Sequence, residues 1–84
     1  MDKQIKFTIE SEKALHSLHI EVQKLIKKDL KRLARGEISG KPLKEQLSGL
    51  FSLRIGNYRI IYSLEKDKII VFDVGYRKSI YDKK

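Results

Sequence analysis

The sequence predicts an α+β fold, in which an N-terminal strand and a helical region pack on an antiparallel sheet of about four strands. Two observations carry this prediction. Apolar residues recur at spacings of three and four within residues 12–35, which is typical of an amphipathic helix. Three segments of alternating character then follow at 50–55, 58–65 and 68–75, separated by short turn sequences.

The chain opens with an alternating segment, which predicts the first strand. Ile5, Phe7 and Ile9 alternate with polar residues, so one face of this strand is expected to be buried. Ser11 is the expected N-cap of the helix that follows, because its hydroxyl can accept a hydrogen bond from a free amide of the first turn.

The helical region is strongly amphipathic, with lysines and arginines over most of its polar surface. Gly36 is placed to end it as the C′ residue. One helix over 12–35 and two helices with a break near 17–19 both fit. No glycine or proline marks a break, yet His19 and Ile20 are mediocre helix formers. The apolar positions of the second half are Val22, Leu25, Ile26, Leu30, Leu33 and Ala34.

Residues 37–49 contain two glycines and the only proline, and they are expected to form a connecting loop. The three strands after it are joined by Gly56-Asn57, a strong signal for a tight hairpin, and by Lys66-Asp67, a weaker one. The expected topology is therefore strand, helical region and three-stranded meander.

Alternation along these strands assigns side chains to two faces of the sheet. Ser52, Arg54 and Arg59 fall on the face away from the helices, and continued alternation puts Arg77 there as well. Guanidinium groups bind phosphate in a bidentate manner, so this face suits a phosphate backbone. A solvated face with surface arginines is the alternative. The expected core positions are Phe51, Leu53, Ile55, Tyr58, Ile60, Tyr62, Leu64, Ile70, Phe72 and Val74.

Composition limits the partners. The chain has 84 residues, expected to form a single domain over 1–84, and 19 Lys and Arg against 11 acids give a net charge of +8. Such a charge attracts nucleic acid or acidic proteins. Without cysteine there is no disulfide. No apolar run approaches the roughly 18 residues of a membrane span, and no secretory signal precedes the first strand, so we expect a cytoplasmic protein.

Few other groups could supply chemistry. His16 and His19 lie three residues apart near Glu12, but a third strong ligand is lacking, so no metal site and no cofactor are expected. Lys41 and Lys44 flank the expected cationic face as loop lysines.

Two phenols stand near cations in the last part of the sequence. Tyr76 and Tyr81 lie beside Arg77 and Lys78, which makes them candidates for proton transfer. Alternatively, Tyr76 continues the core face and Tyr81 packs against a helix edge.

Three segments carry a resemblance to the RelE/ParE superfamily of toxins from toxin–antitoxin pairs, and it covers essentially the whole chain. The core pattern is Arg-x-Gly-x-Tyr-Arg-x-x-Tyr, and the Arg-x-x-x-Tyr ending is similar to the RelE branch. The segments are Leu47-Ser48-Gly49, Leu53-Arg54-Ile55-Gly56-Asn57-Tyr58-Arg59-Ile60-Ile61-Tyr62, and Val74-Gly75-Tyr76-Arg77-Lys78-Ser79-Ile80-Tyr81.

The resemblance implies metal-independent cleavage of mRNA in the ribosomal A site, by attack of a 2′-hydroxyl on the adjacent phosphate, and neutralisation by an acidic antitoxin. Arg54 would hold the phosphate or activate the nucleophile, and Arg59 would bind the phosphate. Arg77 would stabilise charge or help the leaving oxygen, and Tyr81 would stack on or orient a base. RNA contacts are expected from Lys41, Lys44, Ser52, Tyr76 and Lys78.

Two positions depart from common family patterns. Tyr76 stands where many relatives have a histidine that acts in proton transfer, and Ser52 stands where some have a lysine. Two other functions therefore stay open. One is non-enzymatic inhibition of DNA gyrase, as in ParE relatives. The other is an inactive toxin-fold module that acts with its antitoxin as a repressor component.

Overall fold

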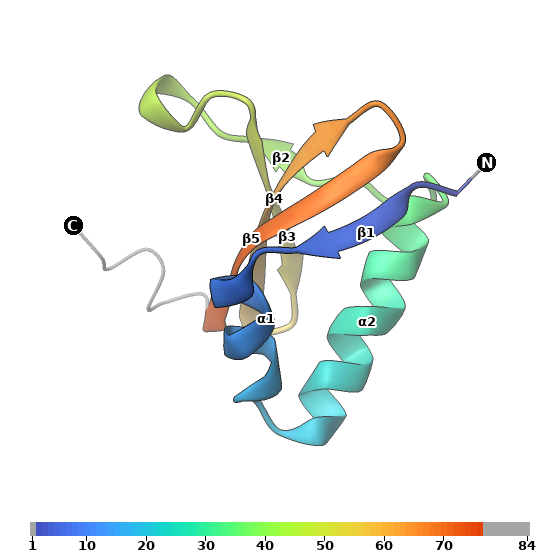
Figure 1. The fold of residues 1–84 in the computed structure, drawn as a ribbon, viewed down its shortest axis with the longest axis vertical. Coiled ribbons are helices and arrows are strands. Elements are labelled where there is room, and N and C mark those ends of the chain that lie inside the picture. The colour runs from blue at the N-terminus through green and yellow to red at the C-terminus, as the bar shows by residue number, and fades with distance from the viewer. Residues whose placement is uncertain (1, 77–84) are drawn as a thin grey trace.

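Five strands form one mixed sheet, and two helices cover one of its faces (Figure 1). The structure is a computed structural model that describes residues 2–76. The α+β fold is confirmed. The elements are β1 (Gln4–Phe7), α1 (Ile9–His16), α2 (Ile20–Ala34), β2 (Lys41–Pro42), a 3-10 helix (Glu45–Leu47), β3 (Leu50–Ile55), β4 (Tyr58–Glu65) and β5 (Lys68–Tyr76).

The strand order is β1-β5-β4-β3-β2. β1 pairs with β5 in parallel, and the other pairs are antiparallel. The expected sheet of about four strands lacked β2, which comes from the segment interpreted as a loop. β2 is a two-residue edge strand that pairs Lys41 with Ser52 and Pro42 with Phe51.

The helical region consists of two helices, so the break near 17–19 is confirmed and a single helix is wrong. Thr8, not Ser11, caps α1, since its Oγ1 accepts a hydrogen bond of 3.1 Å from the Ser11 amide. Ser11 is buried instead, and its hydroxyl donates to the carbonyl oxygen of Val71 at 2.8 Å. The Ser11 hydroxyl thus connects α1 to β5 through a hydrogen bond. Ile9 begins α1 and does not belong to the strand.

Gly36 ends α2 as expected. Its φ of 81° is one that glycine adopts without strain. Its amide donates to the carbonyl of Leu33 at 3.0 Å, and the amide of Glu37 donates to that of Arg32 at 2.9 Å. These two bonds form a Schellman motif, which satisfies the last carbonyls of the helix.

The register of β5 shifts at the point where it pairs with Ile61 and Tyr62 of β4. Ile61 opposes Asp73 whereas Tyr62 opposes Val71, so Phe72 is an extra residue in a β-bulge. The bulge reverses the alternation along β5. The prediction that Ile70 and Phe72 lie in the core is therefore wrong. Phe72 is 43% exposed, and Ile70 is only half-buried.

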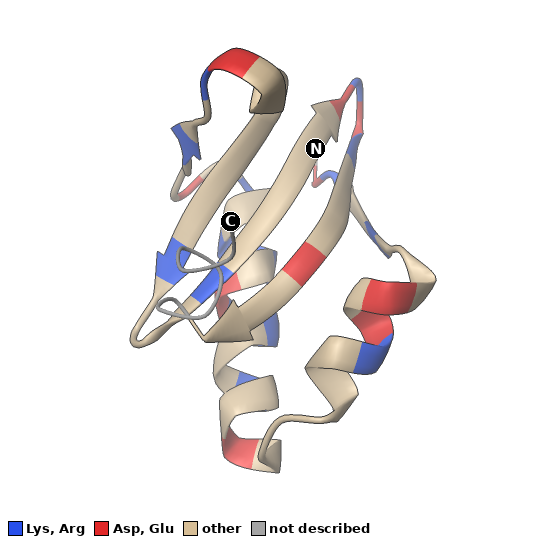
Figure 2. Ribbon diagram, turned by 90° about the vertical axis from the view of Figure 1, so that its left-hand side faces the viewer, with Lys and Arg blue, Asp and Glu red and all other residues tan. Residues whose placement is uncertain are grey.

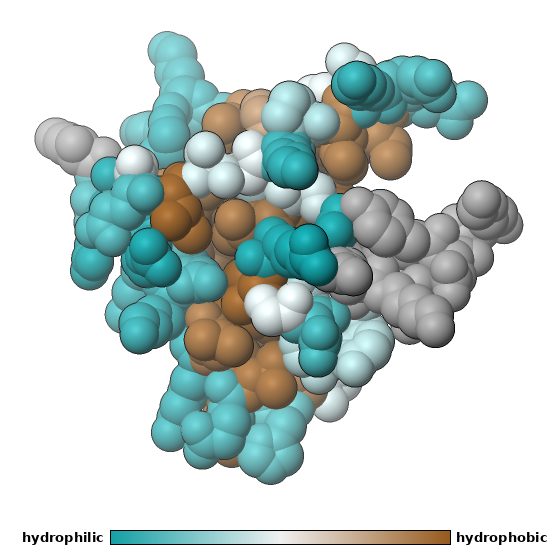
Figure 3. All heavy atoms as spheres, turned by 180° about the vertical axis from the view of Figure 1, so that it is seen from behind, coloured by the Kyte–Doolittle hydropathy of each residue, from teal (hydrophilic) through white to brown (hydrophobic). Residues whose placement is uncertain are grey.

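The core lies between the helices and the covered face of the sheet. Leu64, predicted to be buried, is 45% exposed near the end of β4. Viewed from behind, hydrophobic residues gather in a band bordered by hydrophilic ones (Figure 3). No helix in residues 2–76 is long and apolar enough to cross a membrane. The buried apolar residues are Leu15, Ile26, Leu30, Leu33, Ala34, Leu53, Ile55, Ile60, Tyr62, Ile69, Val71 and Val74.

Figure 2 looks onto the other face of the sheet, which no described helix covers. On this open face, basic positions lie side by side on neighbouring strands. Within residues 2–76, the helices therefore cover only the opposite face and not the one on which the sequence predicted a cationic site.

Candidate functional site

Two arginines lie directly opposite each other on the open face. The Gly56-Asn57 turn pairs Ile55 with Tyr58, so the next pair of the β3–β4 ladder is Arg54 with Arg59. Cross-strand partners in an antiparallel sheet lie about 5 Å apart and share a face. Two like charges in this arrangement repel each other, and a bound anion would relieve that repulsion.

A serine from β3 fixes one of these arginines. The guanidinium Nη1 of Arg59 donates a hydrogen bond of 3.0 Å to the Oγ of Ser52. Ser52 is only 7% exposed, although its backbone position is on the open face. Ser52 thereby holds the Arg59 side chain, which is half-buried, against the sheet. In β5, on the other side of β4, Arg59 pairs with Gly75, which has no side chain to occupy the space beside the guanidinium group.

A groove of ≈ 370 Å³ runs along this part of the sheet and brings four of the predicted site residues together. Lys41, Ser52, Arg54 and Arg59 all line it. Lys41 enters because β2 pairs it with Ser52. We call this feature the sheet groove. Its described lining is Ser39, Gly40, Lys41, Pro42, Leu43, Ser52, Leu53, Arg54 and Arg59.

The sheet groove has a one-sided charge. Its described lining contains three cations and no carboxylate. Asp73 is the acid of β5 nearest in register to this pair, and no ion pair joins it to Arg54 or Arg59 within residues 2–76. A groove lined by three cations, with no carboxylate among its described lining residues, favours an anionic ligand.

Other predicted site residues are not brought into the groove. Lys44 is exposed just before the 3-10 helix and is not part of the lining. Tyr76 pairs with Tyr58 across β4 and β5, and their rings meet edge to face at 5.2 Å. Tyr58 packs partly buried against the core, whereas Tyr76 is 49% exposed, so the alternative that Tyr76 is a core residue is wrong. The site residues Arg77, Lys78 and Tyr81 lie outside the described residues.

Sequence reasoning missed Gly40, which lines the groove, and Tyr62, which lies beneath it. The Gly40 amide donates a hydrogen bond of 2.9 Å to the Tyr62 hydroxyl. Burial raises the pKa of Tyr62, and this hydrogen bond lowers it to a smaller extent. Tyr62 was predicted correctly as a core residue, but alternation carries no information on what its hydroxyl meets. A glycine two residues before the only proline was the available signal.

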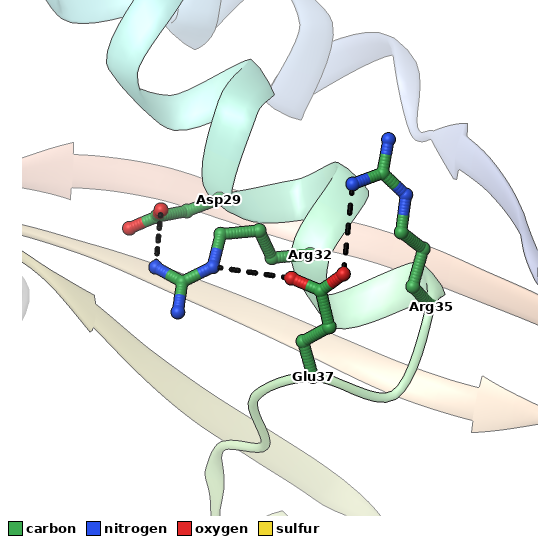
Figure 4. Close-up of polar contacts among 4 residues, drawn as sticks. All are labelled: Asp29, Arg32, Arg35 and Glu37. Carbon is green, nitrogen blue, oxygen red and sulfur yellow. Dashed lines mark ion pairs between the residues drawn. The ribbon is translucent and has the colours of Figure 1, made fainter.

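A second cationic surface lies on α2, and we call it the helix patch. It surrounds a groove of ≈ 420 Å³ whose described lining includes one acid, Glu37, and Figure 4 shows the ion pairs around it. Arg32 lies 3.5 Å from Asp29 and 3.6 Å from Glu37, and Arg35 lies 3.6 Å from Glu37. The lining of the helix patch is Lys24, Lys27, Lys28, Lys31, Arg32, Arg35 and Glu37.

The fold and the sheet groove define a small α+β module with an open cationic face, and comparison with known proteins identifies its class. Residues 2–81 match the model of a family described as the ParE toxin of type II toxin–antitoxin systems. The chain belongs to this family. Its place in the RelE/ParE superfamily, which the sequence motif indicated, is confirmed.

Two of the similar proteins come from Mycobacterium tuberculosis. The chain is 29% identical over 85 residues to toxin RelG of Mycobacterium tuberculosis, covering 92% of this chain and 93% of RelG. It is similar to a chain of the toxin–antitoxin complex RelBE2 from M. tuberculosis, with 27% identity, a TM-score of 0.83, and coverage of 92% and 100% of the two chains.

Two further solved structures share the fold. One is the RelB-RelE antitoxin–toxin complex of Methanococcus jannaschii, at 28% identity and a TM-score of 0.72, with 92% of this chain and 95% of that chain covered. A mutant of Escherichia coli toxin RelE in the free state gives a TM-score of 0.78 at 20% identity, with 94% and 87% covered. The family model and the relatives thus name two branches of one superfamily.

Proposed function

We propose that this toxin cuts mRNA on the ribosome and that a cognate acidic antitoxin neutralises it. The observation that carries the proposal is the Arg54–Arg59 pair in a groove whose described lining has no carboxylate. Two guanidinium groups on adjacent strands can contact one phosphate from two sides, and each can form charge-assisted hydrogen bonds. Lys41 adds a third cation at the groove edge.

The proposed reaction is an attack of a ribose 2′-oxygen on the adjacent phosphorus. A bond forms from phosphorus to the 2′-oxygen, and the bond from phosphorus to the 5′-oxygen of the next nucleotide breaks. The 2′-hydroxyl loses a proton and the leaving oxygen gains one. Arg54 and Arg59 would bind the phosphate and stabilise the extra negative charge of the transition state. Arg77 and Tyr81 are proposed for the leaving oxygen and for base stacking, respectively.

Dependence on the ribosome follows from the chemistry of the groove. Arginine keeps its proton at neutral pH, and the described lining offers no histidine, carboxylate or phenol as a general base. Much of the rate would therefore have to come from holding the 2′-oxygen in line with the phosphorus. A ribosome that presents mRNA in a fixed conformation would supply that alignment.

The partners follow from the charge and from the relatives. A net charge of +8 attracts an acidic protein over long range. Two relatives were solved in complexes of toxin and antitoxin. We propose that an acidic antitoxin covers the open face of this toxin. The proposal fails if pull-downs from the native host recover ribosomes or gyrase and never a small acidic protein.

A second candidate function is non-enzymatic inhibition of DNA gyrase. The match to the ParE toxin family model favours it. It requires no cleavage chemistry from the arginine pair.

One experiment separates the two functions. Primer extension on mRNA from induced cells is expected to show cuts in translated regions, spaced in phase with codons, and Arg59→Ala should remove them. Intact mRNA together with inhibited supercoiling by purified gyrase would favour the second function. If neither effect occurs while the antitoxin still binds, the protein is an inactive toxin-fold module.

A further inference from the structure

β2 is the least secured element around the sheet groove, yet it carries one of the three groove cations. It consists of Lys41 and Pro42 alone and pairs only with β3. Proline has no amide to donate, so it cannot add a ladder hydrogen bond. The amide of Leu43 continues the pairing with a bond of 2.9 Å to the carbonyl of Leu50. An edge strand of this length needs a further contact to stay in register.

A buried tyrosine from β4 supplies that contact. Tyr62 is 1% exposed, and its hydroxyl extends beneath β3 to accept the hydrogen bond from the Gly40 amide. The ring is held by Phe51, which stacks on it at 5.4 Å with an interplanar angle of 18°. Phe51 in turn pairs with Pro42 of β2. The hydroxyl therefore lies at a fixed point below the start of the edge strand.

The approach at Gly40 is too close for any other residue. A Cβ atom added at Gly40 would lie 2.7 Å from the Ser52 carbonyl oxygen and 2.7 Å from the Tyr62 hydroxyl. The backbone at Gly40 thus rests directly on both groups. The hydrogen bond depends on this approach, and Lys41 is the next residue along the chain.

Tyr62 cannot take part in the reaction directly. Its side chain lies on the helix side of the sheet, where Ile60 and Val71 are buried, and it does not line the groove. Burial also raises its pKa, so the phenol keeps its proton at neutral pH. Any effect of the hydroxyl on the groove has to pass through the Gly40 backbone.

We propose that Tyr62 is a positioning residue of the sheet groove, which holds β2 through the Gly40 amide so that Lys41 lies beside Arg54 and Arg59. The position of Lys41 can be tested without knowing the function. The effect of that position on RNA cutting rests on the proposed function. The matching variant is Tyr62→Phe, which keeps the ring and its stacking on Phe51 and removes only the hydroxyl.

Amide hydrogen exchange followed by NMR tests the placement without any assay of activity. In Tyr62→Phe the amides of Gly40 and Leu43 should exchange about tenfold faster, the effect expected when one partly buried hydrogen bond is lost. Leu43 is the informative probe, because its own bond to Leu50 does not involve Tyr62. Amides of β5 should keep their rates.

Tyr58→Phe is the matched control, since it removes a phenol hydroxyl from the same strand and the same face. It should leave both β2 amides unchanged. Unchanged exchange at Leu43 in Tyr62→Phe would overturn the proposal, because β2 would then hold its register without the hydroxyl.

A double-mutant cycle tests the consequence for RNA. If Tyr62 acts through Lys41, Tyr62→Phe should reduce codon-phased mRNA cutting several-fold in the wild-type background and not at all in the Lys41→Ala background. Equal losses in both backgrounds would assign Tyr62 to general stability and overturn the link to Lys41. If the wild type does not cut mRNA, the proposed function fails, and the exchange rates still decide the positioning role.

Discussion

The helix patch and the sheet groove are both rich in cations, but they differ in how the charge is compensated. In the helix patch, Glu37 lies 3.6 Å from both Arg32 and Arg35, and Asp29 supports Arg32 (Figure 4). In the sheet groove, Arg54 faces Arg59 and the described lining contains no acid.

This difference has a physical meaning. Exposed ion pairs contribute little to stability, but they lower the local potential and reduce attraction for an external anion. Repulsion between like charges that face each other across a hairpin lowers the stability of the fold, and a bound anion would reduce that repulsion. We therefore propose that the sheet groove binds the ligand and that the helix patch contributes only long-range attraction.

The largest expected effect comes from Arg59→Ala. Removing one preorganised charge-stabilising donor costs about a hundredfold in rate, so mRNA cutting and growth inhibition should fall by about that factor. Arg59 is half-buried and bonded to Ser52, so the free energy of unfolding should also fall, by about 1 kcal/mol. Primer extension and urea denaturation measure the two effects.

The control removes the same charge from the helix patch. Arg35→Ala should leave cutting within about threefold of the wild type, because it changes only the long-range field. Equal losses in the two variants would show that the two surfaces do not differ in the way described.

Gly40→Ala tests whether the sheet groove depends on its edge strand. The added methyl group would collide with the Ser52 carbonyl and the Tyr62 hydroxyl, so β2 has to move. We expect a loss of about 1–3 kcal/mol in the free energy of unfolding, measured by urea denaturation, since overpacking costs that much. Ser39→Ala, at the exposed neighbouring position, should change it little. An unchanged denaturation midpoint for Gly40→Ala would contradict the close approach.

Arg54→Glu turns the repulsive cross-strand pair into an attractive one. The free energy of unfolding should rise by about 0.5 kcal/mol while cutting is lost, because opposite charges across strands stabilise a sheet by that order. Thermal unfolding at low salt measures the gain, and high salt should reduce it. Arg54→Gln should lie between the wild type and Arg54→Glu. A destabilised Arg54→Glu would mean that the two guanidinium groups do not repel each other.

The smallest effect is expected from Glu37→Gln in the helix patch. This change removes the carboxylate shared by Arg32 and Arg35, both of which are exposed. The free energy of unfolding should change by less than about 0.5 kcal/mol, as for most surface ion pairs. If urea denaturation shows that the free energy of unfolding falls by more than about 1 kcal/mol, the ion pairs of the helix patch stabilise the fold. The contrast with the sheet groove would then not be one of attraction against binding.

The sequence by itself determined the features that depend on near neighbours along the chain. Amphipathic spacing placed α2, and Gly36 marked its end, because only a residue that tolerates positive φ fits the Schellman motif. The Gly56-Asn57 turn fixed the register of the hairpin, which set Arg54 opposite Arg59 on the open face. The central pair of the sheet groove was therefore predictable from the sequence.

Tertiary structure alone decided the features that depend on distant residues. The bulge at Phe72 reversed the faces of β5, and the Tyr62 hydroxyl met Gly40 from two strands away. The pairing of β2 with β3 moved Lys41 from an expected loop into the groove lining. Local alternation reports which side chains share a face within one strand, but it contains no information on how an edge strand docks or where a ladder gains a residue.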